Sequence, residues 1–261
     1  MIDRDAASGQ AVGDAASAHA PVPLREVVAE PIPAWRHRVL GTDAADIAVH
    51  QDSGDAEAIR LEAAVVGAGC FWGVEKLLWN TPGVVHTEPG YAGGTMEDPD
   101  YRTVCSGRTG HAEVVLAVFD PARVTYRDLV RLVLENHDPT QGNRQGNDIG
   151  DQYRSVIFTT SDHQLVTAET SRIDYDNRLA VGGFGRITTQ IAPLDRFWRA
   201  PEDDHQQYLH KVPDGYCGLR GTGVQASSAA AVHEAATGES DGNPEPSPSS
   251  AGGSSVAAGA L

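Results

Sequence analysis

The sequence predicts an α+β domain in which helices pack against one antiparallel sheet. Between residues 59 and 177, strand-like and helix-like runs alternate in the order β-α-β-β-α-β. The chain has 261 residues, 40% of them hydrophobic, which is enough for a sizeable core. This order is the split βαβ pattern of the ferredoxin-like α/β plait. We therefore expect that plait with flanking helices, long irregular loops and a Gly-rich C-terminal segment.

In the first half of the pattern, Pro and Gly residues separate the predicted elements. Residues 59–66 are apolar and predict a strand, and residues 73–80 predict a helix that the following Pro-Gly pair ends. Residues 84–91 predict the second strand. A long Gly-rich loop, 92–110, follows it.

The second half repeats the order with longer elements. Residues 112–119 are apolar on both faces and predict a central strand, and 125–136 predict an amphipathic helix. A polar loop precedes the fourth strand, 153–159. Residues 161–177 predict a helix with its first serine as the cap, and 187–191 predict a further strand.

Four segments divide the chain. Residues 1–20 are rich in Ala, Gly and Asp, and residues 226–261 contain no aromatic residue, Lys or Arg, so we expect both to be disordered. Residues 21–58 carry prolines and spaced apolar residues, which predict an extended arm packed on the core. Residues 59–225 form the expected catalytic domain.

Composition excludes several classes of function. The formal charge of −16 argues against nucleic-acid binding, which requires clustered Lys and Arg. No signal-peptide pattern and no apolar run of membrane-spanning length occurs, so we expect a soluble, cytoplasmic protein. We also expect a monomer. The three cysteines include no CxxC pair, which makes a metal site or a disulfide scaffold unexpected and favours redox chemistry.

The expected topology brings five chemically useful residues to one rim of the sheet. The third and fourth strands flank the first and run antiparallel to it, so the exit of the first meets the entrances of the other two. Cys70 follows the first strand, while Glu113 and Tyr153 stand at those entrances. Tyr101 and Asp148 lie on the two long loops that open onto the same rim.

Cys70 lies where a strand turns into a helix. The positive pole of a helix N-terminus favours the thiolate, so we expect a lowered pKa and a nucleophile. The alternative is a small buried apolar residue. Gly67, Gly69 and Gly73 favour the first interpretation, because they permit a tight turn and the close approach of a ligand.

The neighbouring side chains suggest what the nucleophile attacks. Phe71 and Trp72 could form the wall of a pocket for a methyl group, or pack beneath the helix. Glu113 is a carboxyl in an apolar strand, so burial should raise its pKa and keep it an acid, unless a neighbouring Arg holds it as a structural carboxylate. Tyr101 and Tyr153 offer hydroxyl donors, although tyrosines at strand edges are often packing residues.

Other polar residues give weaker signals. Asp148 in GNDIG is also typical of a turn, and His111 and His137 show no spacing that marks a catalytic triad. A thiolate with an acid and hydroxyl donors suits an electrophile that loses an oxygen. A sulfoxide fits that description.

Four motifs resemble, in order, those of the A class of peptide methionine sulfoxide reductases. They read GCFWGVEKLLWNTPGV, GYAGGTMEDPDYRTVCSGRTGHAEVV, ENHDPTQGNRQGNDIGDQYRS and EDDHQQYLHKVPDGYCG, and the similarity spans residues 21–224. The resemblance implies reduction of the S epimer of free and protein-bound methionine sulfoxide, which repairs oxidised proteins.

The resemblance also implies the site roles. Cys70 attacks the sulfoxide sulfur and is left as a sulfenic acid, while Glu113 protonates the oxygen with help from Tyr101 and Tyr153. The remaining implied roles concern the pocket: Phe71 and Trp72 enclose the methyl group, and Asp148 orders the pocket.

The implied recycling uses a second cysteine. Cys217, in a Gly-rich segment, resolves the sulfenic acid as a disulfide that thioredoxin or dithiothreitol reduces, with no bound cofactor. Longer members carry a further cysteine where this chain has Gln225, so we expect no relay through a third thiol. Cys105 is expected to be structural.

Two alternatives use the same residues differently. A thiol peroxidase or glutathione-dependent transferase could also use Cys70 and Cys217, but it usually places an Arg beside the nucleophile, and GCFWG contains none. A non-catalytic module could bind oxidised or methionine-rich peptides through the aromatic pair.

Overall fold

The description of the fold rests on a computed structural model of the chain. It covers residues 37, 39–41 and 61–226. The disorder predicted for residues 1–20 and 226–261 lies outside the described residues, apart from Ala226. Most of the predicted arm, 21–58, also lies outside them.

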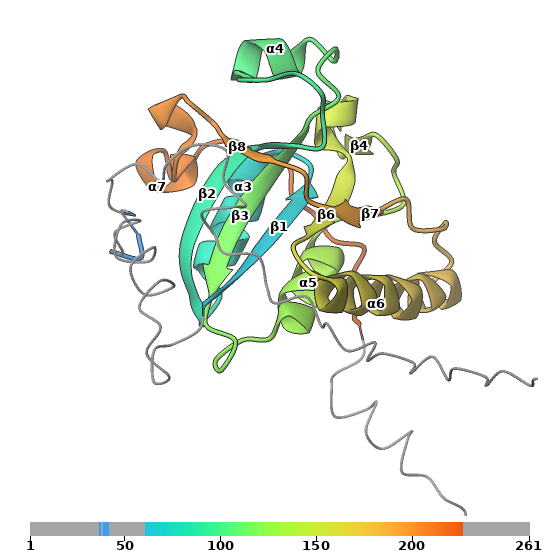
Figure 1. The fold of residues 1–261 in the computed structure, drawn as a ribbon. Helices are drawn as coiled ribbons and strands as arrows, with labels where there is room; N and C mark the ends of the chain where they lie inside the picture. Colours follow the sequence, from blue (N-terminus) through green and yellow to red (C-terminus); the bar gives the residue numbers. More distant parts are fainter. Residues whose placement is uncertain (1–36, 38, 42–60, 227–261) are drawn as a thin grey trace, which may run out of the picture. The chain divides into compact units, whose positions relative to one another are not determined.

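The first strand occupies the middle of the sheet. β1 (Glu62–Ala68) pairs antiparallel with β3 (Ala112–Phe119) on one side and with β6 (Ser155–Thr159) on the other. β2 (Val84–Ala92) pairs antiparallel with the far edge of β3. The pairing expected around the first strand is therefore observed, and it brings the end of β1 to the beginnings of β3 and β6 (Figure 1).

Two further strands widen the sheet to the order β7-β6-β1-β3-β2-β8. β7 (Gln190–Pro193) runs parallel to β6, three residues later than the predicted start of this strand. β8 (Phe197–Arg199) pairs antiparallel with β2 and was not predicted, since three residues are too few to show an alternating pattern.

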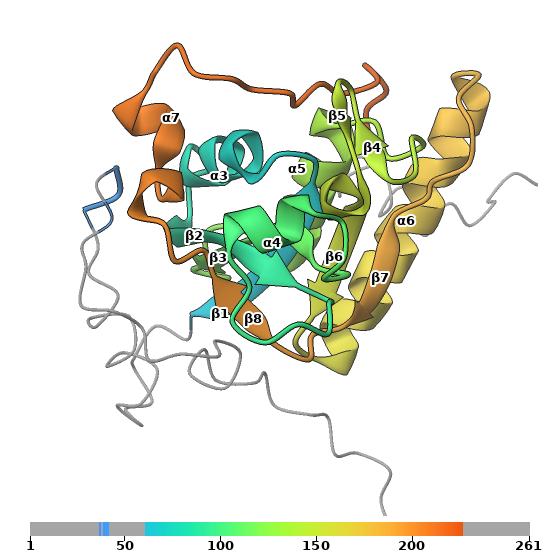
Figure 2. The ribbon, with the colours of Figure 1, turned by 90° about the horizontal axis from the view of Figure 1, so that it is seen from above.

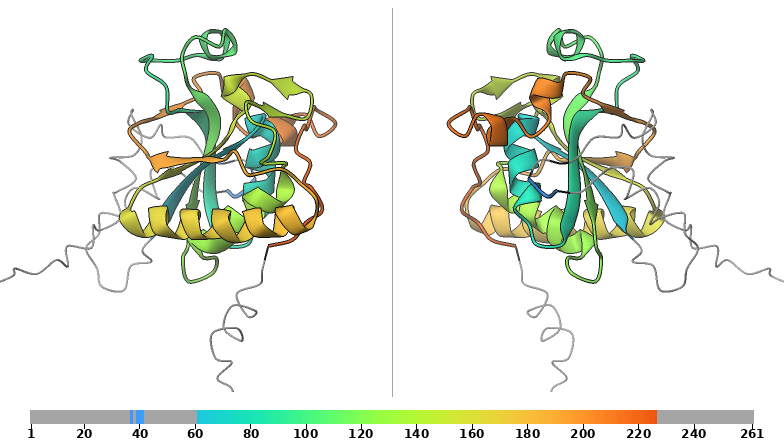
Figure 3. Two further views of the ribbon diagram at one scale, coloured as in Figure 1. Left: turned by 90° about the vertical axis from the view of Figure 1, so that its right-hand side faces the viewer. Right: turned by 90° about the vertical axis from the view of Figure 1, so that its left-hand side faces the viewer.

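Three helices share one face of the sheet (Figure 3): α3 (Phe71–Trp79), α5 (Tyr126–Asn136) and α6 (Asp162–Val181). Thr125 and Ser161 cap the last two, each accepting a hydrogen bond from the third residue after it. The main core lies between these helices and the sheet. It includes Val66, Val115 and Val130.

Short elements form the rim at the end of β1. The 92–110 loop contains an unpredicted helix, α4 (Tyr101–Cys105), which begins with a capping box between Asp100 and Thr103. The other short elements are β4 (Arg144–Gln145), β5 (Asp148–Ile149), the 3-10 helices η1 (Asp151–Tyr153) and η2 (Asp203–His205), and α7 (Tyr208–Lys211). Among the described residues, no helix is long and apolar enough to cross a membrane.

Candidate active site

Cys70 stands at the turn between β1 and α3. It is the N-cap of α3 and is half-buried. Gly69 precedes it with φ of 90°, and a Cβ there would lie 2.6 Å from the Cβ of Gln145. Only glycine tolerates both the left-handed backbone and the lack of space, so this turn fixes where the sulfur lies.

The expectation that Cys70 is a thiolate is wrong for the unliganded site. Burial raises the pKa of the thiol well above its ordinary value, and the neighbouring Glu113 raises it further. The N–H of Trp72, in the first helical turn, does bond the sulfur and lowers the pKa, but this effect is the smaller one. Burial and Glu113 therefore favour the protonated thiol of Cys70 in this structure.

Glu113 lies beside Cys70 as the second residue of β3. Its side chain shares the helix-covered face with Val115 and is only 1% exposed. Its Oε2 accepts the N–H of Phe71 at 3.0 Å. The pKa of Glu113 is raised to about 8, mainly by burial; the Phe71 bond opposes the shift, and Asp148 adds to it. The carboxyl is thus mostly protonated at neutral pH and can act as an acid.

Tyr101 and Tyr153 enter the same rim from α4 and η1. Both tyrosines are electrostatic neighbours of Cys105, Glu113 and Cys70. Burial raises the pKa of Tyr101 to about 12 and also raises that of Tyr153, so both remain proton donors. Cys105, expected only as a structural residue, is an exposed thiol and an electrostatic neighbour of both donors.

Asp148 begins β5 and has a partner that the sequence did not suggest. Its Oδ2 accepts the hydroxyl of Tyr216 at 3.0 Å. Burial raises the pKa of Asp148, whereas the Tyr216 bond lowers it. Because Tyr216 precedes Cys217, Asp148 links the β4–β5 hairpin to the segment of the second cysteine.

Cys217 lies against the first turn of α3. A Cβ on Gly73 would lie 3.0 Å from its Sγ, and Cys217 is one of the electrostatic neighbours of Cys70. In Figure 2 the segment after α7 runs past α3 toward β4 and β5. Cys70, Cys105 and Cys217 are all free thiols.

The two aromatic residues after Cys70 have different surroundings. Phe71 is 1% exposed and packs in the core, with its ring centroid 5.8 Å from that of Tyr91. Trp72 is half-buried; its Nε1–H donates to Nδ1 of His205 at 3.1 Å, and its ring stacks on Tyr208 at 3.8 Å. Sequence reasoning missed His205 and Tyr208. Both residues lie in the fourth motif, EDDHQQYLHKVPDGYCG, which could have indicated them, although only its cysteine was predicted to belong to the site.

His111 and His137, the two histidines considered from the sequence, make structural contacts. His111 contacts the carbonyl of Met96 through Nε2, and His137 contacts Val133 and Ser155 through its two ring nitrogens. Within the described residues, no group of three or more His, Cys, Asp or Glu is arranged to hold a metal ion.

Comparisons with known proteins agree with this geometry. The family model for peptide methionine sulfoxide reductase matches residues 62–236. Peptide methionine sulfoxide reductase MsrA of Rhodospirillum centenum is 60% identical over 164 residues, 63% of this chain and 74% of that protein. MsrA 1 of Caulobacter vibrioides is 58% identical over 164 residues, 63% and 75% of the two chains.

A solved structure is similar over a larger share of the chain. Methionine sulfoxide reductase A of Corynebacterium diphtheriae superposes with a TM-score of 0.62 at 44% identity, covering 76% of this chain and 93% of that one. Together with the match to the family model, this likeness shows that the chain belongs to the peptide methionine sulfoxide reductase family, oxidoreductases that return methionine sulfoxide to methionine.

Proposed function

We propose that Cys70 and Glu113 together reduce the S epimer of methionine sulfoxide, free and within oxidised proteins. The observation that carries this proposal is a buried carboxyl, with its pKa raised to about 8, beside a half-buried thiol. The Cys70 sulfur attacks the sulfoxide sulfur while Glu113 supplies a proton to the oxygen, and the proton of the Cys70 thiol passes to the carboxylate that this leaves on Glu113. The S–O bond of the substrate breaks, the oxygen ends on Cys70 as a sulfenic acid, and methionine leaves.

The rest of the site holds the substrate during this step. The hydroxyls of Tyr101 and Tyr153 donate to the sulfoxide oxygen as negative charge develops there. The half-buried ring of Trp72 contacts the substrate methyl group, and Phe71 supports that wall from the core. Asp148 orders the pocket through its bond with Tyr216.

Cys217 completes the cycle. Its thiol attacks the sulfenic sulfur of Cys70, which forms a disulfide and releases water. The closeness of its Sγ to Gly73, three residues after Cys70, supports this role. Thioredoxin in the cell, or dithiothreitol in the assay, reduces the disulfide and supplies two electrons. No bound cofactor takes part, and Gln225 stands where longer members have a further thiol.

The same proposal covers the cellular location, the oligomeric state and the fold. We expect a cytoplasmic monomer that binds no nucleic acid, metal or membrane, in line with its charge of −16. The strands β6, β1, β3 and β2, with α3 and α5, have the connections of a ferredoxin-like plait, which β7 and β8 extend. Residues 59–225 then form the catalytic domain.

A stereochemically resolved assay tests the proposal. The full chain should form methionine from the S epimer with either dithiothreitol or thioredoxin as reductant, and should leave the R epimer unchanged. Hydrogen peroxide provides the comparison for a thiol peroxidase. Faster turnover of peroxide than of the sulfoxide, or reduction of the R epimer alone, would contradict the proposal.

A further inference from the structure

Glu75 is a buried carboxyl that the reaction does not use. It lies on α3 three residues after Trp72 and is 0% exposed. Gln207 donates to it twice, from the backbone N–H at 2.9 Å and from the side-chain amide at 3.3 Å, and the hydroxyl of Thr87 donates at 3.2 Å. Burial raises the pKa of Glu75 to about 8, and these bonds oppose the shift. A buried carboxyl requires such donors, so the contacts are mutually dependent.

The Thr87 hydroxyl extends this chain of bonds to the N-terminal part of the protein. Because its hydrogen points to Glu75, the oxygen accepts from Nε2 of His37 at 2.7 Å. Nδ1 of His37 in turn accepts the N–H of Leu40 at 3.0 Å. This pattern assigns the proton of a neutral ring to Nε2, and burial lowers the pKa of His37 to about 3. In this series of hydrogen bonds from Leu40 through His37 and Thr87, each donor therefore points toward Glu75.

Gln207 connects the same carboxyl to the substrate wall. Its φ and ψ are 48° and 43°, a left-handed conformation that is unfavourable for a residue with a side chain. The two bonds to Glu75 hold it there. Gln207 stands between His205, which accepts the Trp72 indole N–H, and Tyr208, which stacks on the Trp72 ring. Both contacts that orient Trp72 thus depend on a turn that Glu75 fixes.

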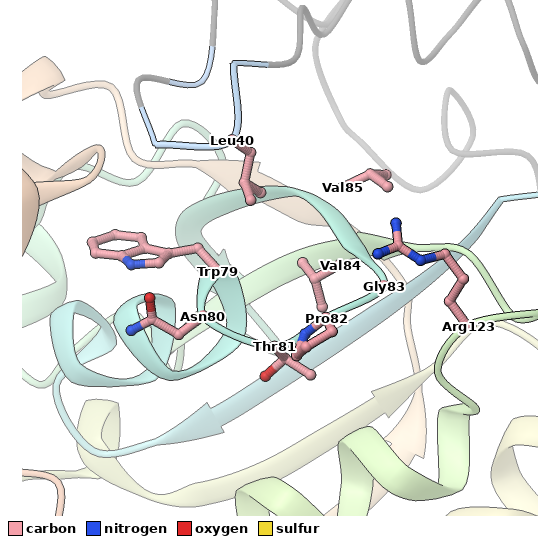
Figure 4. A pocket seen from close by; sticks show the side chains of 9 residues that line it. All are labelled: Leu40, Trp79, Asn80, Thr81, Pro82, Gly83, Val84, Val85 and Arg123. Atoms are coloured by element: carbon pink, nitrogen blue, oxygen red, sulfur yellow. The ribbon is translucent and has the colours of Figure 1, made fainter.

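The His37 segment contacts α3 far from Cys70. Leu40 lines a surface pocket together with Trp79, the last residue of α3, and Arg123 (Figure 4). The ring of His37 lies edge-on to that of Trp79, with 6.2 Å between centroids. The hydrogen bonds through Thr87 and Glu75 connect this segment to the turn that holds Trp72.

We propose that Glu75 is a positioning residue for Trp72, and that His37, through Thr87, lets the N-terminal segment set the affinity of the methyl-binding wall. The inference rests on the proposed function, because it assigns that wall to Trp72. It assigns a role to residues 37 and 39–41, which contact none of the reacting groups in the bonds described above.

A matched pair of variants tests the connection. Thr87→Val removes the hydroxyl and keeps the volume, whereas Thr87→Ser keeps the hydroxyl. In single-turnover experiments on the full chain, Thr87→Val should weaken the affinity for methionine sulfoxide about fivefold and change the rate of methionine formation less than twofold. Thr87→Ser should restore the affinity. Ser171→Ala, which removes a buried hydroxyl from α6, should bind as the wild type does.

Two further variants sharpen the test. Glu75→Gln places an amide N–H against a donor, so it should weaken affinity more than Thr87→Val does. His37→Ala should act in the same direction, and its effect should not add to that of Thr87→Val if both act along one chain. If Glu75→Gln fails to fold, the Thr87 pair still decides.

Tryptophan emission separates positioning from general destabilisation. Thr87→Val should shift the emission of the wild type but not that of a Trp72→Phe background, whereas Thr87→Ser should leave the emission unchanged. If Thr87→Val lowers the melting temperature and alters neither affinity nor the emission of Trp72, the inference is wrong. If the wild type reduces no sulfoxide, the proposed function fails, while the emission experiment still reports whether Thr87 positions Trp72.

Discussion

The two cysteines that the proposed cycle joins lie in opposite surroundings. Cys70 is half-buried between a core strand and a helix, beside a carboxyl that bonds the next residue. Cys217 is exposed, in a segment without helix or strand that contains four glycines between residues 215 and 223. The contrast indicates a division of labour. Attack on the sulfoxide requires fixed geometry, whereas resolution requires a sulfur that can approach and withdraw.

The largest expected effect is on the fixed side of this comparison. Cys70→Ser should abolish methionine formation with either reductant, because it removes the sulfur that attacks the sulfoxide. Methionine release measured by chromatography checks this, and a circular dichroism spectrum should match that of the wild type. Continued turnover in this variant would mean that another cysteine attacks the sulfoxide.

Glu113→Gln should follow in size. Loss of a positioned acid should slow methionine formation about 10²- to 10⁴-fold, since the amide cannot supply the proton. The pKa of Glu113 is raised to about 8, so the acid is present below that pH and lost above it. The wild-type rate of methionine formation should therefore fall as pH rises through about 8, and the variant should lack this decline. A variant that keeps the decline would assign it to another group.

Gly73→Ala tests the exposed segment that carries Cys217. The added Cβ would lie 3.0 Å from the Sγ of Cys217 and 3.1 Å from the Cβ of Leu219, so the segment has to move away. Disulfide formation should slow about tenfold, while the first methionine forms at the normal rate. Alanine has a higher helix propensity than glycine, so the substitution should not destabilise α3 by weakening the helix itself. Rapid-quench thiol counting measures the disulfide. An equal slowing of both steps would mean that the substitution disturbs Cys70 itself.

Tyr216→Phe should give the smallest effect. It removes the exposed hydrogen bond to Asp148, which is worth about 1 kcal/mol or less, so resolution should slow by about two- to fivefold. The same thiol counting checks this, with the first step as the internal control. A larger effect on methionine formation than on the disulfide would place Tyr216 in substrate binding.

The parts of the fold that the sequence predicted have strong local patterns. The strand 112–119 was predicted to the residue, because its apolar side chains fill both faces of the sheet. α4 was missed because it has five residues among glycines, although Asp100 and Thr103 carry its capping signal. The pairing of β1 with β3 and β6 followed from the element order alone.

The sequence predicted which residues form the site, but not their burial, their protonation or their hydrogen-bond partners. The sheet topology specifies which strand ends meet, and it places Cys70 beside Glu113; Tyr101, Asp148 and Tyr153 reach the same rim from α4, β5 and η1. The protonation of Cys70 depends instead on burial and on Glu113, 43 residues away in the sequence, which a local helix-terminus argument does not include. The partners of Trp72 lie more than 130 residues further along the chain, at a separation where no local pattern operates.

The most direct test of the division of labour is a single-turnover experiment on Cys217→Ser with thioredoxin as the only reductant. We predict a rapid burst of one methionine per protein, followed by a stall with Cys70 trapped as a sulfenic acid that a dimedone probe labels. Sustained turnover without a stall, or no burst at all, would contradict the account.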